Sequence, residues 1–226
     1  MWSFELEAPP QSVAACLEWL SDEERERAQR FRFPYLQTRY ILAHGVLRKL
    51  LSSFGGVEPA ELRFVTATPA GKPSLAPGSP GADTLTFNLS HSSTRALVGI
   101  GLGIPMGVDL ECLRTEVDAL SISRHYFFGA ERDAIEAAAG LREHTFFRYW
   151  VAKEAVLKAQ GVGLGFPLDR FRVDFLPDAQ TARIDSLDPE RLASDWMVRM
   201  LPCEAGWLGA VAARGSDWRV KIERLL

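Results

Sequence analysis

The chain has 226 residues, of which 47% are hydrophobic and 24% are charged, and its formal net charge is −3. A chain of this length can bury a substantial core as one large domain or two small ones. The slightly acidic balance excludes a general attraction to nucleic acid or to a membrane surface, so we expect neither as a partner. The longest apolar run, residues 96–108, is interrupted by Pro105 and four glycines and is too short to span a bilayer.

The cysteines and the first residues of the chain both predict a cytoplasmic protein. Cys16, Cys112 and Cys203 have no CxxC spacing and an odd count, which argues against a disulfide framework or a zinc site. We therefore expect three buried thiols in a reducing compartment. The first residues include Glu5 and Glu7 and lack the basic-then-apolar pattern of a signal peptide.

Hydrophobic periodicity and turn residues predict helices and strands along the whole chain. Ser21 to Glu24 has the form of a capping box, which marks the start of the second helix. A loop rich in proline and glycine is expected at 68–82. The predicted helices cover 14–20, 21–31, 37–54, 117–126, 130–139 and 143–160. The predicted strands cover 2–6, 62–66, 85–89, 96–102, 106–110, 171–175, 182–186, 196–201, 207–213 and 218–222.

An internal repeat indicates that the chain consists of two similar halves. Residues 39–43 (Arg-Tyr-Ile-Leu-Ala) recur 109 positions later at 148–152 (Arg-Tyr-Trp-Val-Ala), and Lys49 matches Lys158 at the same offset. In both halves the long predicted helix ends in glycines and is followed by a strand-rich segment. These features favour a duplicated α+β unit, with the join near residues 103–105.

Four charged side chains are predicted to converge in the second half. Asp109 and Glu111 are two positions apart in a strand, so they point to the same side. Trp150, Glu154 and Lys158 recur every four residues and share one face of a helix. Three clustered carboxylates cannot all stay ionised without a cation, and a hard divalent ion such as Mg²⁺ suits oxygen ligands. If this helix face lies against the strand, the three acidic residues form a metal site.

A basic segment in the first half has two possible roles. Residues 27–49 contain six basic residues and no acidic ones. This charge pattern is typical of an anion-binding surface and equally of a solvated helix face.

Four motifs follow one another along the chain. They are Gly-Lys-Pro at 71–73, Phe-Asn-Leu-Ser-His-Ser at 87–92, Gly-Val-Asp-Leu-Glu at 107–111 and Trp-Val-Ala-Lys-Glu-Ala-Val-Leu-Lys at 150–158, the last followed by Gly-Val-Gly-Leu at 161–164. In this order and at these spacings the sequence resembles the Sfp-type 4′-phosphopantetheinyl transferase family, and the resemblance covers most of the chain.

The resemblance implies an α+β fold in the form of an intramolecular pseudo-dimer, with the active site in the cleft between its two halves. Residues 1–105 are then expected to contact the nucleotide of coenzyme A, and residues 106–226 to hold the metal and receive the carrier protein. The implied reaction transfers the 4′-phosphopantetheine arm of coenzyme A to a serine of an acyl or peptidyl carrier protein and releases 3′,5′-ADP. Mg²⁺ is the expected metal, Mn²⁺ is the alternative, and the protein is expected to be a monomer.

The resemblance and the chemistry of phosphoryl transfer together assign roles to individual residues. Glu154 is the expected base for the attacking serine, Asp109 is the second candidate, and Lys158 is expected to stabilise the leaving phosphate. The expected metal ligands are Asp109, Glu111 and Glu154. The expected coenzyme A contacts are Arg27, Arg39, Lys72, Pro73, Ser90, His91, Asp109 and Lys158. The family often has a lysine at the position of Glu24, one helical turn before Arg27, and some members use a threonine at the position of Tyr40 to contact the nucleotide.

The segment at 112–142 is where the family receives its carrier protein. Phe127 and Phe128 in this segment fit either a core position or an exposed docking anchor.

Two other functions share part of this residue pattern. A metal-dependent phosphodiesterase or nuclease also uses clustered acidic residues with a lysine, but the chain lacks the broad basic stripe of a polynucleotide binder. A non-catalytic carrier-protein-binding module is the second alternative, and the presence of all three carboxylates and the lysine argues against it.

Overall fold

The computed structural model describes residues 1–68 and 71–224. Its helices are α1 (Pro10–Glu18), α2 (Asp22–Gln29), α3 (Pro34–Gly55), α4 (Ala119–Tyr126), α5 (Gly129–Ala137) and α6 (Arg142–Gln160), with short 3₁₀ turns at Pro59–Glu61, Ala139–Leu141, Gly163–Gly165 and Leu168–Arg170. Its strands are β1 (Trp2–Glu5), β2 (Phe64–Thr66), β3 (Pro73–Leu75), β4 (Leu85–Ser92), β5 (Arg95–Leu102), β6 (Met106–Cys112), β7 (Phe171–Phe175), β8 (Thr181–Ser186), β9 (Trp196–Leu201), β10 (Trp207–Arg214) and β11 (Glu223–Arg224). None of the described helices is long and apolar enough to cross a membrane.

The predicted α+β class is confirmed, and the order of elements repeats along the chain. Strand β1, helices α1–α3 and hairpins β2–β3 and β4–β5 are followed by strand β6, helices α4–α6 and hairpins β7–β8 and β9–β10. In each series the first strand pairs antiparallel with the last, β1 with β5 and β6 with β10. The sheets have the orders β11-β1-β5-β4 and β6-β10-β9-β8-β7, with β2 and β3 as a separate pair.

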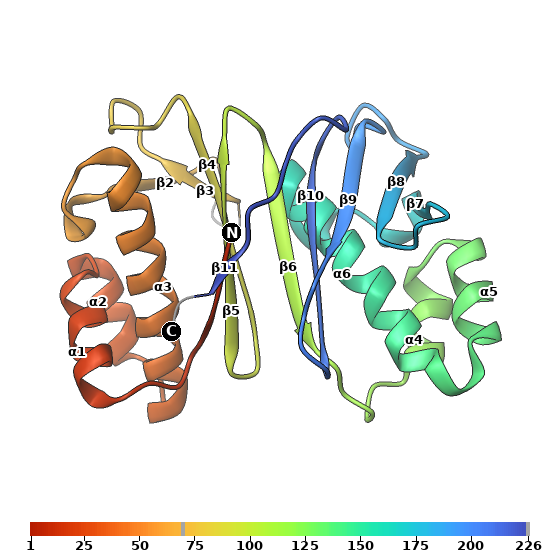
Figure 1. Cartoon of the computed structure of the whole chain (residues 1–226), viewed down its shortest axis with the longest axis horizontal. Coiled ribbons are helices and arrows are strands. Elements are labelled where there is room, and N and C mark those ends of the chain that lie inside the picture. The colour runs from red at the N-terminus through yellow and green to blue at the C-terminus, as the bar shows by residue number, and fades with distance from the viewer. Residues whose placement is uncertain (69–70, 225–226) are drawn as a thin grey trace.

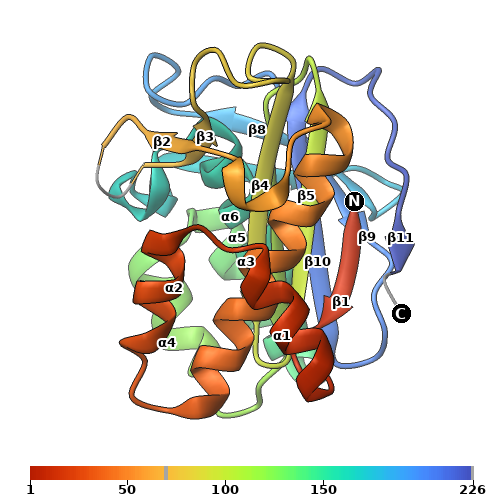
Figure 2. The ribbon, with the colours of Figure 1, turned by 90° about the vertical axis from the view of Figure 1, so that its left-hand side faces the viewer.

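The strands occupy the middle of the molecule, with helices α1–α3 on one side and α4 and α5 on the other (Figure 1). Figure 2 shows α1, α2 and α3 covering the sheet of the first half. Between the two main sheets lies an apolar cluster that joins them. Its buried members are Met1, Leu97, Met106, Val108, Leu110, Val211 and Ala213.

The capping box predicted at the start of α2 is present. The Glu24 backbone N–H donates to Ser21 Oγ at 3.3 Å, and the Ser21 N–H donates to the Glu24 carboxylate at 3.2 Å. Helix α5 begins in a related way, because the Phe128 N–H donates to the Glu131 carboxylate at 3.0 Å. Both glutamates therefore satisfy backbone donors that a helix start leaves free.

The same two glutamates each bind a buried cation on the long helix of their half. Arg48 of α3 lies 2.5 Å from Glu24, and Lys153 of α6 lies 3.0 Å from Glu131. Burial lowers the pKa of Lys153 to about 8 and raises the pKa of Glu131, because both charges are removed from water. Each cation also donates to two carbonyl oxygens of the segment after its helix. These carbonyls belong to Pro59 and Leu62 in the first half and to Leu168 and Phe171 in the second.

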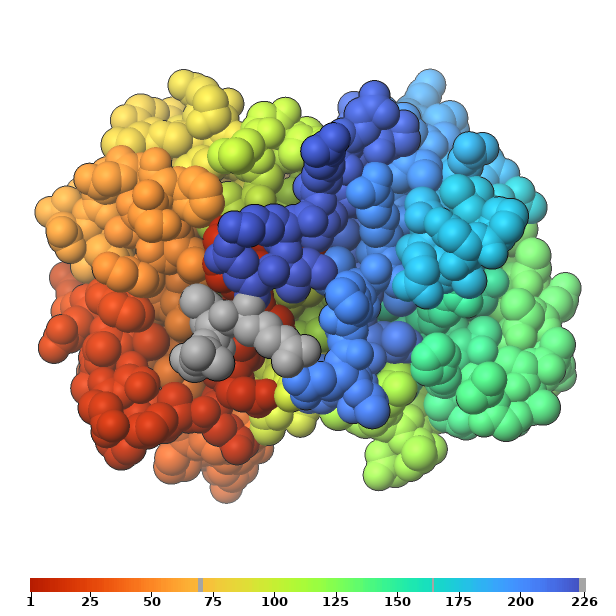
Figure 3. Space-filling model, viewed as in Figure 1, coloured from red at the N-terminus to blue at the C-terminus, as the bar shows by residue number. Residues whose placement is uncertain are grey.

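Two strands differ from the sequence prediction. Strand β3 forms inside the predicted loop at 68–82, of which residues 69–70 lie outside the described part of the chain. The last strand was expected at 218–222, and this prediction is wrong. The structure instead pairs Glu223–Arg224 in parallel with β1, and the terminal ammonium of Met1 donates to the Lys221 carbonyl at 2.7 Å. In Figure 3 the dark blue end of the chain lies against the red N-terminal residues between the two halves.

The three cysteines are free thiols, as expected, but only Cys16 is buried. Cys112 is half-buried and Cys203 is exposed, so the prediction of three buried thiols is wrong for these two. Cys203 lies in the connection between β9 and β10.

Candidate active site

Gly107 allows helix α6 to lie directly against strand β6. A Cβ atom built on Gly107 would lie 2.3 Å from the Ala155 carbonyl oxygen and 2.3 Å from the Ala159 nitrogen, so no side chain fits there. This close approach brings Glu154 and Lys158 of α6 beside the carboxylates of the strand. The convergence predicted from the two periodicities therefore occurs.

Asp109 is the centre of a hydrogen-bonded triangle. Its side chain is buried, and Oδ1 accepts from Lys158 Nζ at 2.6 Å and from Ser90 Oγ at 2.8 Å. Lys158 Nζ also donates to Ser90 Oγ at 2.9 Å. Strand β4 of the first half, strand β6 and helix α6 therefore meet at one carboxylate. Lys158 binds Asp109, although the spacing of four residues would equally suit an ion pair with Glu154.

Glu154 and Glu111 lie within electrostatic reach of Asp109 and of each other. Burial, followed by the negative charge of Asp109, raises the pKa of Glu154 to about 7; Glu111 adds to this effect and Lys158 opposes it. Burial and Asp109 also raise the pKa of Glu111, against a hydrogen bond from Ser92. The three carboxylates therefore repel one another, as expected for a site that gains from a cation.

The carboxylates fit a hard metal ion that also binds substrate oxygens. Asp109 Oδ2 and Glu154 Oε1 are buried, and neither finds a hydrogen-bond partner within residues 1–68 and 71–224. In the same part of the chain no three His, Cys, Asp or Glu side chains are arranged to hold a metal by themselves. Mg²⁺ is typically held by one or two carboxylates together with phosphate oxygens and water, so a closed protein cage is not needed.

Strand β4 contributes three polar side chains that the sequence analysis used only in part. They accept hydrogen bonds from backbone N–H groups of β6. The pairs are Asn88 with Val108, Ser90 with Leu110 and Ser92 with Cys112, at 2.9, 3.3 and 3.2 Å. Ser92 Oγ also donates to the Glu111 carboxylate at 2.6 Å. The sequence signal was the alternation of Asn88, Ser90 and Ser92 on one face of a strand, and only Ser90 was assigned to the site.

His91, on strand β4 of the first half, lies close to several positive charges. His91 keeps an exposed edge, and partial loss of solvent lowers its pKa, as do the positive charges of His44, Lys158 and Arg39. His91 therefore lies in the electrostatic field of Lys158, Arg39 and His44. Arg39 donates to Glu7 at 3.0 Å. These positive groups make an anionic substrate favourable beside the carboxylates.

Arg27 belongs to a neighbouring aromatic group. Its guanidinium lies 5.5 Å from the ring centre of Tyr40, and the Tyr40 ring lies 4.1 Å from that of His44. His44 Nδ1 lies 3.5 Å from Glu24. Glu24 is therefore held between His44 and Arg48.

Lys72 joins the loop of the first half to the start of β6. Its ammonium donates to the Met106 carbonyl at 2.5 Å, and burial lowers its pKa to about 8. A Cβ built on Gly161, at the end of α6, would lie 3.5 Å from the Lys72 side chain. Pro73 follows as the first residue of β3, opposite Thr66. Lys72 therefore lies near the end of α6, beyond Lys158.

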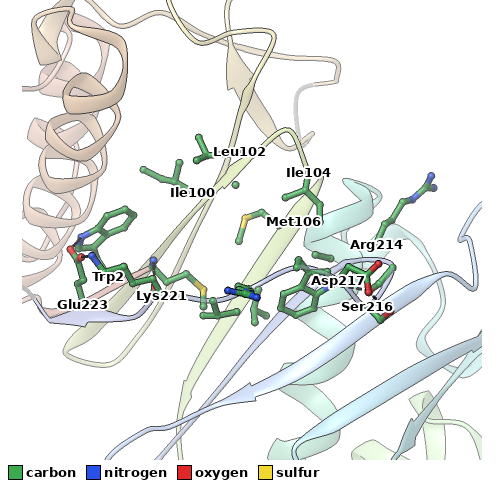
Figure 4. A pocket seen from close by; sticks show the side chains of 18 of the residues that line it. Trp2, Ile100, Leu102, Ile104, Met106, Arg214, Ser216, Asp217, Lys221 and Glu223 are labelled. Atoms are coloured by element: carbon green, nitrogen blue, oxygen red, sulfur yellow. Dashed lines mark hydrogen bonds and ion pairs between the residues drawn. The ribbon is translucent and has the colours of Figure 1, made fainter.

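A cavity of about 780 Å³ lies on the other side of β6 (Figure 4). It is bounded by the β5–β6 hairpin and the segment 214–221, with Ile100, Met106 and Trp218 in its lining. Met106 belongs to the alternate set of β6 residues, which face the apolar cluster between the sheets. None of the described residues that line this cavity is a predicted site residue. Asp109 and Glu111 lie on the opposite face of the strand, away from this cavity.

Comparisons with known proteins identify relatives over nearly the whole chain. A family model described as the 4′-phosphopantetheinyl transferase superfamily matches residues 105–212. The 4′-phosphopantetheinyl transferase HetI of a Nostoc species is 32% identical over 224 residues, which cover 98% of this chain and 90% of that protein. The 4′-phosphopantetheinyl transferase Sfp of Bacillus subtilis is 28% identical over 203 residues, covering 89% and 85%. A phosphopantetheinyl transferase of a Thraustochytrium species is 31% identical over 196 residues, covering 79% and 65%.

Proposed function

Because the chain belongs to the 4′-phosphopantetheinyl transferase superfamily, we propose a Mg²⁺-dependent reaction that transfers the arm of coenzyme A to a carrier-protein serine and releases 3′,5′-ADP. Membership of this superfamily gives the enzyme class, which transfers phosphopantetheine to carrier proteins. The observation that carries the detailed proposal is the group formed by Asp109, Glu154 and Lys158 where α6 lies against β6.

Asp109 and Glu154 would hold the metal, each through a buried oxygen that lacks a partner in the described structure, and Glu111 is the third candidate ligand. When bound, Mg²⁺ would offset the negative charge of the phosphate oxygens and align them for displacement. Mn²⁺ has the same preference for oxygen ligands and is the alternative.

Glu154 suits the role of general base in this reaction. The serine oxygen of the carrier forms a bond to the phosphorus next to the pantetheine, and the serine proton passes to the Glu154 carboxylate. Without a metal, burial and the neighbouring carboxylates raise the pKa of Glu154 to about 7, so this carboxylate can both release and accept a proton near neutral pH. Asp109 is the second candidate, but its Oδ1 already accepts two hydrogen bonds.

Lys158 suits the role of stabilising the leaving group. The bond from that phosphorus to the bridging oxygen breaks, and its electron pair stays on the 3′,5′-ADP. The Lys158 ammonium is half-buried and fixed by Asp109 and Ser90, so its positive charge is in place before charge develops on the phosphate.

The first half supplies the proposed coenzyme A contacts. We assign Arg39, Lys72 and His91 to contacts with coenzyme A, and His91 would act mainly as a neutral hydrogen-bonding group because its pKa is lowered. Ser90 holds Lys158 at the same place. Arg27 lies over the ring of Tyr40, and Pro73 is the first residue of strand β3. We assign both residues to the nucleotide end of coenzyme A.

We assign carrier docking to the second half, within the segment 112–142. Phe127 is buried and stacks on Phe146 at 5.3 Å, so it belongs to the core. Tyr126 and Leu141 are 59% and 66% exposed and are the better candidates for contact with a carrier protein. Because Ser90 and Asp109 come from the two halves of one chain, we further propose that a monomer is active. We also propose that the protein works in the cytoplasm, without nucleic acid or membrane partners.

Intact-mass measurement of an apo carrier protein tests this function. The carrier is incubated with the enzyme, coenzyme A and Mg²⁺, and a parallel sample contains EDTA. We expect the carrier to gain one phosphopantetheine arm, and EDTA to prevent the gain. Cleavage of coenzyme A or of DNA without transfer would instead favour a phosphodiesterase, and carrier binding without transfer a non-catalytic module.

A further inference from the structure

We propose that Ser92 is a positioning residue that orients Glu111 toward the metal from across the junction of the two halves. Ser92 belongs to β4 in the first half, and Glu111 belongs to β6 in the second. The inference rests on the proposed metal site and adds to it a residue that the catalytic motifs leave unassigned.

Strand β6 is the end strand of the five-stranded sheet, so the N–H groups along its outer edge face β4. The side chains of Asn88, Ser90 and Ser92 accept the N–H groups of alternate β6 residues, as described above. A buried N–H group without a partner is costly, so each of these bonds helps to hold the two halves together. This joining role is common to all three side chains.

The two serines have a second role that Asn88 lacks. Ser90 Oγ donates to Asp109 at 2.8 Å, and Ser92 Oγ donates to Glu111 at 2.6 Å. Asn88 accepts the Val108 N–H, and the preceding β6 residue is Gly107, which has no side chain. Side chains alternate with a period of two in both strands. Each β4 serine that accepts a β6 N–H therefore also lies beside the side chain of the preceding β6 residue.

The hydrogen bonds of Ser92 fix the direction of its hydroxyl. A serine hydroxyl has one hydrogen to donate, and its oxygen accepts from the Cys112 N–H at 3.2 Å. The hydrogen is therefore directed at Glu111 Oε2, which also lies 3.6 Å from Arg114. With Oε2 held in this way, the orientation of the carboxylate is set before a metal binds. Partners of this kind typically contribute about 10- to 100-fold to metal affinity.

A matched pair of variants separates orientation from simple joining of the halves. Ser92→Ala removes one backbone bond and the hydroxyl that binds Glu111. Asn88→Ala removes one backbone bond of the same kind and leaves both carboxylates untouched. Ser92→Thr keeps a hydroxyl and serves as the rescue variant.

The experiment is a Mn²⁺ titration of the full-length protein with saturating coenzyme A and no carrier, followed by electron paramagnetic resonance of free Mn²⁺. We expect Ser92→Ala to raise the Mn²⁺ dissociation constant about 10-fold or more, and Ser92→Thr to restore it. Asn88→Ala should leave this constant within about 2-fold of the wild type, although urea unfolding should show a loss of stability. An unchanged constant in Ser92→Ala, or an equal rise in Asn88→Ala, would overturn the inference.

The wild-type titration separates this inference from the proposed function. If the wild type binds no Mn²⁺ with coenzyme A present, the metal site itself is wrong and the role of Ser92 falls with it. If the wild type binds Mn²⁺ and Ser92→Ala binds it equally well, only the positioning role is overturned.

Discussion

The Lys158 ammonium lies 2.6 Å from Oδ1 of Asp109, so an ion pair ties helix α6 to strand β6 at the centre of the site. The pair places a positive charge beside the carboxylates without using the second oxygen of Asp109, which stays free of protein partners in the described structure. The arrangement suits an enzyme in which a lysine and a metal ion both face the phosphates of the substrate.

Replacing Lys158 by alanine should reduce catalysis more than binding. Removal of one fixed donor to a developing negative charge typically lowers kcat by about 10²- to 10³-fold. Steady-state kinetics of Lys158→Ala with an apo carrier should show this fall in kcat with a smaller change in KM for coenzyme A. An unchanged kcat would remove Lys158 from the reaction and leave it as a structural partner of Asp109.

Glu154→Gln should abolish most transfer while coenzyme A still binds. The amide cannot take the serine proton, and a general base typically contributes about 10²- to 10⁴-fold to rate. Turnover and isothermal titration with coenzyme A would be measured on the same preparation. Retention of substantial turnover would rule out Glu154 as the base and favour Asp109.

The same substitution should change how stability depends on pH in EDTA. The folded protein keeps a proton on Glu154 up to about pH 7, whereas the unfolded chain releases it near 4.5, the ordinary pKa of a glutamate. The wild type should therefore lose stability as the pH rises from 4.5 to 7, and Glu154→Gln should lose less. At about pH 8 the variant should be more stable by about 1 to 3 kcal/mol, since one pKa unit corresponds to about 1.4 kcal/mol. Urea unfolding at several pH values measures this, and parallel pH profiles would contradict it.

Lys72→Ala should weaken coenzyme A more than dephospho-coenzyme A. We propose that the Lys72 ammonium contacts the 3′-phosphate of coenzyme A, and hydrogen bonds to charged groups contribute about 1.5 to 3 kcal/mol. Burial lowers the pKa of Lys72 to about 8, so coenzyme A binding by the wild type should also weaken as the pH rises through 8. Dissociation constants for both ligands give the comparison, and equal losses would place Lys72 away from the 3′-phosphate.

Lys153→Met should destabilise the fold without a specific effect on the site. It leaves Glu131 buried without its cation, and breaking a buried pair in this way costs about 3 to 5 kcal/mol. The double variant Lys153→Met with Glu131→Gln should recover much of this loss, because no uncompensated charge remains. Urea unfolding of both variants tests the coupling, and additive losses would show that the two side chains act independently.

The main features of the site could be predicted because they follow from two local periods. A spacing of two in β6 places Asp109 and Glu111 on one side, and a spacing of four in α6 aligns Glu154 with Lys158. The partner of Lys158 could not be predicted in this way. Lys158 pairs with Asp109 because α6 lies very close to β6, and Gly107 allows this close approach.

The features that sequence missed depend on contacts between distant segments. Strand β3 contains only three residues and begins with a proline, so it carries no alternation signal. Strand β11 is defined by its pairing with β1 at the other end of the chain. The contacts of Ser92 with Glu111 and Cys112 depend on the position of β4 along the outer edge of β6.

The internal repeat has a consequence for stoichiometry. At the offset of 109 residues, Gly45 corresponds to Glu154, and a Cβ built on Gly45 would lie 2.6 Å from Cys16 of α1. Lys49, the counterpart of Lys158, lies over the Trp19 ring at 5.5 Å. Helix α1 and the residue after it thus fill the space where a second copy of the site, generated by the internal repeat, would form. We therefore expect each chain to bind a single coenzyme A molecule, in contrast to a symmetric dimer, which would present two equivalent clefts.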